Sequence, residues 1–107
     1  MTEDNKIQEM QFLEQNMQNL MMQKQAFQME LSETEAALKE IEDSGGEVFK
    51  IIGQLMIKTE KEKLKEELGN KKKILDIRLK AIENQEKSLT EKLEEYREEI
   101  MKGVKEK

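Results

Sequence analysis

Two heptad patterns, one toward each end of the chain, constrain the fold more than any other feature of the sequence. In the first pattern apolar residues recur alternately every three and four positions, with eight apolar members among these ten: Met10, Leu13, Met17, Leu20, Lys24, Phe27, Leu31, Thr34, Leu38 and Ile41. This spacing gathers the side chains on one helix stripe and is typical of a coiled-coil seam. We predict a helix from about residue 3 to about residue 42, ending at "DSGG", where paired glycines favour a turn.

The second pattern repeats the spacing in the last part of the chain: Leu68, Lys72, Leu75, Leu79, Ile82, Glu86, Leu89, Leu93, Tyr96 and Ile100. Thr59, with acidic residues just after it, is a suitable N-cap for a helix from about residue 60 to about residue 105. Two such helices joined by a short segment should fold back as an antiparallel coiled coil. A register that pairs Leu31 with Leu75 also brings Lys24 within about one turn of Glu86, and a polar pair in a seam fixes register at some cost in stability.

The composition supports long helices and excludes several other classes of protein. Charged residues make up 40% of the chain and hydrophobic residues 36%, and Trp and Pro are absent, which suits a coiled coil better than a compact globular core. No apolar run is long enough to span a membrane, so we expect no membrane association. The N-terminus is polar, so we expect no signal peptide. Without Cys or His we expect no disulfide, metal or cofactor, and the lack of Cys is compatible with a reducing, cytoplasmic compartment.

The charge distribution argues against nucleic-acid binding and against catalysis. Residues 1–47 contain 3 Lys against 11 acidic residues, and the whole chain has a formal net charge of −5, whereas a nucleic-acid arm needs a basic footprint. The many carboxylates are expected on solvated helices, with no Gly-rich phosphate loop or His to organise them. We therefore expect the protein not to be an enzyme.

The stretch "VFKIIGQLMIKT", residues 48–59, interrupts the heptads and predicts a β-hairpin within about residues 47–59. Two apolar runs flank Gly53 and Gln54, and Gly at the first central position is the signal for a type II′ turn. Pairing Ile52 with Leu55 and Ile51 with Met56 leaves apolar side chains on both faces of the hairpin. The expected hairpin residues are Val48, Phe49, Ile51, Ile52, Gly53, Leu55, Met56 and Ile57.

A two-stranded hairpin with two apolar faces is marginal in water and prone to aggregation. The helices of the same chain could cover one face at most, so we expect the hairpin to join hairpins of other subunits in a shared sheet or barrel that removes the edges. The alternative is an amphipathic hairpin folded back on its own coiled coil. The predicted fold class is therefore mainly α, a long antiparallel two-helix coiled coil with one central β-hairpin that joins an intersubunit β-barrel.

The central "VFKIIGQLMIKTEKEKLKEEL" between two heptad helices resembles the archaeal beta class of the prefoldin family, and the resemblance covers essentially the whole chain. Its most specific part is hydrophobic–aromatic–Lys, two hydrophobic residues, Gly, and then "LMIKT" running into a Lys/Glu-rich helix. The resemblance implies one subunit over residues 1–107 and a heterohexamer with prefoldin alpha-type subunits, assembled through a double β-barrel. It also implies an ATP-independent chaperone that holds unfolded polypeptides and passes them to a group II chaperonin.

If the hairpin end forms the platform, the free tips carry the N-terminal part of the first helix and the C-terminal part of the second. The expected client-binding residues are apolar residues of these tips: Ile7, Met10, Phe12, Leu13, Met17, Met21, Met22, Tyr96, Ile100, Met101 and Val104. Met is flexible and polarizable and suits a surface with many partners. Met10 and Met17 also occupy seam positions, where a core role is the simpler interpretation. The competing hypothesis for the whole chain is a structural adaptor coiled coil that oligomerises through its hairpin.

Overall fold

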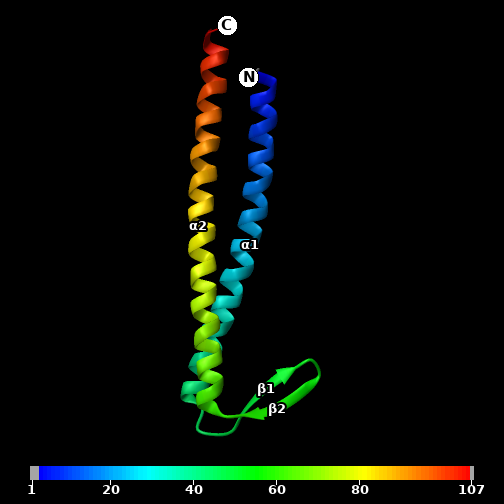
Figure 1. The fold of residues 1–107 in the computed structure, drawn as a ribbon, viewed down its shortest axis with the longest axis vertical. Coiled ribbons are helices and arrows are strands. Elements are labelled where there is room, and N and C mark those ends of the chain that lie inside the picture. The colour runs from blue at the N-terminus through cyan, green and yellow to red at the C-terminus, as the bar shows by residue number, and fades with distance from the viewer. Residues whose placement is uncertain (1–2, 107) are drawn as a thin grey trace. The chain divides into compact units, whose positions relative to one another are not determined.

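The computed structural model describes residues 3–106, with side chains described from residue 4 to residue 103. Helix α1 (Glu3–Asp43) is followed by strands β1 (Val48–Ile52) and β2 (Leu55–Thr59) and then by helix α2 (Lys61–Glu106) (Figure 1). Two long helices thus flank one β-hairpin in chain order. The predicted mainly helical fold class is confirmed.

The chain packs as two compact units, and each helix contributes to both. One unit, the distal unit, combines the part of α1 up to Ala26 with α2 from Leu79 onward. The other, the hairpin unit, is the continuous segment Phe27–Arg78, which contains both strands. The helix parts within each unit are held by the heptad seam.

The seam side chains lie where the heptads place them, because every one of the twenty predicted positions is buried or half-buried. Leu75 in the hairpin unit is the most enclosed, with 2% of its surface exposed, and Leu20 and Ile82 are buried in the distal unit. Thr34 is buried although it is polar. Its hydroxyl donates a hydrogen bond of 2.8 Å to the backbone carbonyl of Glu30, so the burial leaves no unpaired donor.

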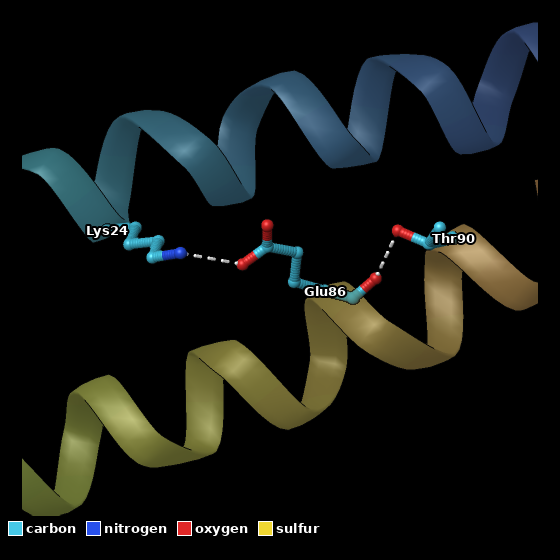
Figure 2. Close-up of polar contacts among 3 residues, drawn as sticks. All are labelled: Lys24, Glu86 and Thr90. Carbon is cyan, nitrogen blue, oxygen red and sulfur yellow. Dashed lines mark hydrogen bonds and ion pairs between the residues drawn. The ribbon is translucent and has the colours of Figure 1, made fainter.

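Polar contacts across the seam show the antiparallel register of each unit. In the distal unit the Lys24 ammonium donates to a Glu86 carboxylate oxygen at 2.9 Å, as the heptad register predicts. Figure 2 shows the Glu86 side chain reaching from α2 toward Lys24 on α1, while the Thr90 hydroxyl donates to the backbone carbonyl of Glu86. The hydrogen bond to Glu86 raises the pKa of Lys24 above its usual value, which keeps the ammonium charged. In the hairpin unit, the Nζ atom of Lys72 lies 3.9 Å from a carboxylate oxygen of Glu35.

The hairpin has the predicted register, with Ile52 opposite Leu55 and Ile51 opposite Met56. Gly53 adopts a φ of 61°, and no other described residue has a positive φ. A type I′ turn would require a positive φ at Gln54 as well, so the connection is type II′. The freedom of Gly53 to adopt this φ is what allows the two strands to turn in two residues.

The junctions between helices and hairpin are fixed by short-range hydrogen bonds. Helix α1 ends in a turn in which the Ser44 amide donates to the Ile41 carbonyl, and the Lys61 ammonium donates to the Ser44 carbonyl at 2.9 Å. The prediction of Thr59 as N-cap of α2 is wrong by one residue. Thr59 pairs with Val48 as the last residue of β2, and the first helical bond of α2 runs from the Leu64 amide to the Glu60 carbonyl.

Candidate functional site

The hairpin presents an apolar surface that the rest of the chain leaves open. Six of its side chains are between 44% and 70% exposed: Phe49, Ile51, Ile52, Leu55, Met56 and Ile57. Val48, at the start of β1, is half-buried. It lines a groove with Phe49 and with residues of α1 and α2 in the same unit, including Ile41, Leu64 and Leu68. The base of the hairpin is therefore packed, whereas the strand bodies and the turn are open.

Both strands of the hairpin are also open along one edge. The described sheet has only these two strands, so each strand has one neighbour and a row of backbone groups on its other side without a strand partner. An open edge next to exposed apolar side chains favours the addition of further strands. This combination makes the hairpin surface a candidate assembly site.

Two ion pairs position the hairpin within its unit. The Lys50 ammonium on β1 donates to a Glu67 carboxylate oxygen on α2 at 2.8 Å, and Lys58 on β2 lies 3.0 Å from Glu47. The hydrogen bond from Lys50 lowers the pKa of Glu67 below its ordinary range, and the positive charge of Lys50 acts in the same direction. Lys50 thus links β1 to α2 while the apolar side chains beside it stay exposed.

The second candidate site, the helix-end surface, is formed by the tip residues of the distal unit. Phe12 and Met22 are 66% and 68% exposed, and Met101 and Ile7 are also exposed. The remaining described members are half-buried: Met10, Leu13, Met17, Met21, Tyr96 and Ile100. The side chain of Val104 lies outside the described residues. The surface therefore consists of a few open apolar side chains on a half-buried seam.

A groove in the distal unit brings some of these side chains together. Phe12, Leu13 and Tyr96 line it with Lys92 and the carboxylates of Glu9, Glu95 and Glu99, and it has a volume of about 560 Å³. The Tyr96 hydroxyl donates a hydrogen bond to Glu9, which raises the pKa of Tyr96 above its usual value. The groove is thus lined by apolar, aromatic and acidic side chains together with one Lys.

The part of the chain that the structure describes contains neither a cluster of potential metal ligands nor a membrane-spanning helix. No cluster of three acidic residues is placed to hold a metal ion. No described helix is long and apolar enough to cross a membrane.

Comparison with known proteins identifies the family of this chain. The family model described as "Prefoldin subunit" matches residues 4–107. The chain belongs to the prefoldin family. A crystal structure of the prefoldin beta subunit from Thermococcus strain KS-1 is similar, with a TM-score of 0.88, 38% sequence identity and coverage of 94% of this chain and 90% of that one.

Curated prefoldin relatives place the chain in the beta class. The prefoldin subunit beta of Thermococcus onnurineus is 43% identical over 94 residues, which are 86% of this chain and 81% of the relative. The corresponding Pyrobaculum aerophilum protein is 33% identical over 82% of this chain and 71% of its own length. These relatives are archaeal. Prefoldin subunits are chaperones and not enzymes, so the family gives this chain a chaperone role.

Three exposed apolar residues of this prefoldin subunit were not anticipated from its sequence: Met29, Ile74 and Ile77. All three lie in the hairpin unit, away from the seam and from the helix ends. A signal was present, since each lies two residues beyond a seam position, Phe27, Lys72 and Leu75 respectively. The seam heptads account for one stripe per helix, and these three residues lie outside it.

Proposed function

We propose that the chain is an ATP-independent holdase subunit that binds unfolded polypeptides through the helix-end surface and passes them to a group II chaperonin in the cytoplasm. The observation that carries this proposal is the exposure of Phe12 and Met101, which lie toward the helix ends far along the chain from the hairpin, and of Met22 near the middle of α1. Apolar side chains held open on a helical support can accept the apolar segments of many clients. Two of the three are Met, which adapts to partners of different shape.

The proposal includes assembly through the hairpin. Residues 1–107 would act as one subunit of a heterohexamer with prefoldin alpha-type subunits, joined through Val48, Phe49, Ile51, Ile52, Gly53, Leu55, Met56 and Ile57 in an intersubunit β-barrel. Closure into a barrel removes the open strand edges and covers both apolar faces. Several helix ends then surround one client, so that weak contacts add up to firm retention.

The client-binding proposal is tested by comparing two double variants in the complete assembly with the alpha-type subunit. The test variant carries Phe12→Ser and Met22→Ser, and the matched control carries Gln11→Ser and Gln23→Ser, which are also exposed and adjacent in α1. Burying two-thirds of a large apolar side chain contributes about 1–2 kcal/mol. We therefore expect the test variant to need at least tenfold more protein to suppress the aggregation of a denatured client.

The control variant should suppress aggregation as the parent does, and both variants should keep the native mass of the assembly. Full suppression by the test variant in an assembly of unchanged mass would contradict client binding at these residues. Failure of the parent assembly itself to delay the aggregation of any denatured client would favour the adaptor hypothesis.

A further inference from the structure

A groove lies at the base of the hairpin, where α1 and α2 meet β1 within the hairpin unit. Its volume is about 390 Å³, within the range of about 300–1,000 Å³ that is typical of ligand pockets. Six of its eight lining residues are apolar, and among these described residues Glu40 carries the only charge: Ala37, Glu40, Ile41, Ser44, Val48, Phe49, Leu64 and Leu68. We call it the base groove.

The helix seam does not account for all the apolar residues of the base groove. Ile41 and Leu68 belong to the seam, but Ala37 and Leu64 lie outside the predicted heptads and are only half-buried. Phe49 on β1 is 47% exposed. Isolated apolar side chains are common on surfaces, but these three line one groove together. Their apolar character is therefore available to a partner.

The base groove adjoins the open edge of the hairpin. Its two strand residues, Val48 and Phe49, both belong to β1, and it contains no residue of β2. Within the described sheet β1 pairs with β2 on one side and with no strand on the other. A strand added at that edge would lie about 4.8 Å from β1. Its residues opposite Val48 and Phe49 would then lie next to the groove.

A second copy of this chain is a poor occupant of the base groove. If β2 of that copy paired with the open edge of β1 in the register of the chain's own hairpin, Lys58 would lie opposite Phe49 and Thr59 opposite Val48. Both side chains are polar, and burial of an unpaired ammonium group among apolar side chains costs free energy. Lys58 is in addition already paired with Glu47 of its own chain.

We propose that the base groove receives an apolar side chain from a strand of the alpha-type subunit that pairs with the open edge of β1. This contact rests on the proposed assembly through the hairpin, and it extends that interface from the strands to the adjoining ends of α1 and α2. Backbone hydrogen bonds can be made by any added strand, whereas a pocket for its side chain gives specificity. The base groove thereby favours an alpha-type neighbour over a second copy of this chain.

Introduced cysteines test whether the base groove is filled, because the chain lacks Cys. The test variant is Ala37→Cys. The matched control is Ala36→Cys, whose neighbouring position is exposed and does not line the groove. The rate of modification by a small methanethiosulfonate is measured in the chain alone and in the assembly with the alpha-type subunit. We expect assembly to slow the modification of Ala37→Cys by roughly tenfold or more and to leave that of Ala36→Cys unchanged.

A second pair of variants fills the groove instead of probing it. Ala37→Phe places a large side chain where the partner's side chain would lie, and Ala36→Phe is the matched control. Ala37→Phe should bind the alpha-type subunit about tenfold more weakly or worse, whereas Ala36→Phe should bind it as the parent does. Circular dichroism and urea unfolding of the isolated chains should show that both variants keep their fold. If Ala37→Phe unfolds more readily than the parent, the thiol rates decide.

Unchanged reactivity of Ala37→Cys in an assembly of full native mass would overturn the proposed contact and leave the proposed function standing. Protection of Ala37→Cys that also develops at high concentration without the alpha-type subunit would mean that a second copy fills the groove, and the proposed partner would be wrong. Failure of the parent chain to associate with the alpha-type subunit would refute the hairpin assembly and this contact together.

Discussion

Substitution of Ile51 by Ser separates the stability of the chain from the stability of its proposed assembly. Ile51 is 70% exposed, so the isolated chain gains little from its side chain, and the free energy of unfolding of the chain should change by less than about 0.5 kcal/mol. In the proposed barrel the same side chain is covered. Burial of the part of Ile51 that the isolated chain leaves exposed then contributes about 1–2 kcal/mol per subunit to association.

The hydroxyl adds to this loss, because burial of a polar group without a hydrogen-bond partner costs about 1–3 kcal/mol. The total of about 2–5 kcal/mol per subunit corresponds to a weakening of association by roughly 30-fold to several thousand-fold. Sedimentation velocity across a range of concentrations should therefore show the Ile51→Ser chain as small species where the parent assembles. Far-UV circular dichroism should show the helical content unchanged.

Lys58→Ser is the matched control for this experiment. Lys58 lies on the other strand of the hairpin and makes only an exposed ion pair with Glu47, which is typically worth little. The control should assemble as the parent does. An Ile51→Ser assembly with the parent's mass and concentration dependence would refute burial of the hairpin face, and loss of helix in the variant would show that Ile51 supports the chain itself.

Three further outcomes are expected from single substitutions. Leu75→Ala leaves a cavity at a buried seam position and should lower the free energy of unfolding, measured in urea, by about 2–5 kcal/mol. Phe12→Ala, at an exposed position, should lower it by less than about 1 kcal/mol. Equal losses for the two variants would contradict the burial of Leu75 in the seam. Gly53→Val disfavours the backbone φ of 61° at a cost of about 1–2 kcal/mol. Amide hydrogen exchange should therefore accelerate in the hairpin and not in the helices. Unchanged protection of the hairpin amides would argue against the type II′ turn. Tyr96 is the single Tyr, so absorbance titration of its phenolate should give a pKa above that of the urea-unfolded chain, because the hydrogen bond to Glu9 favours the neutral phenol. The stability contributed by this raised pKa is present below about pH 10 and is lost as the pH rises through the folded-state pKa of Tyr96. Glu9→Gln should remove the pKa difference between the folded and the unfolded chain. A difference that persists in this variant would mean that Glu9 is not its cause.

The helices and the hairpin register could be predicted from the sequence because both depend on short-range spacing. Alternation of threes and fours selects a helix stripe whatever the partner, and Gly53 between two apolar runs allows a two-residue turn and thereby sets Ile51 opposite Met56. The error at Thr59 has a physical cause of the same kind. A residue suited to cap a helix is also suited to end a strand, and Thr59 ends β2 because it pairs with Val48.

The site was predictable as a set of residue types but not as a set of exposed surfaces. Phe12 and Met21 both lie off the seam in the sequence, yet Phe12 is open and Met21 is half-buried. The exposure of each depends on how far the side chains of the second helix reach around the first. Glu9 and Tyr96 are far apart in the chain, and only the antiparallel packing of the distal unit brings them into a hydrogen bond.

Short-range patterns in the sequence specify two heptad helices, the hairpin between them and its two apolar faces, since periodicity and turn chemistry act over a few residues. Which apolar residues remain exposed once the seam is filled depends on the packing of the helices. Each seam residue is covered by side chains from a distant part of the chain, and burial is a property of that pairing. Met29 and Ile77 remain exposed because other residues fill the seam between the paired helices.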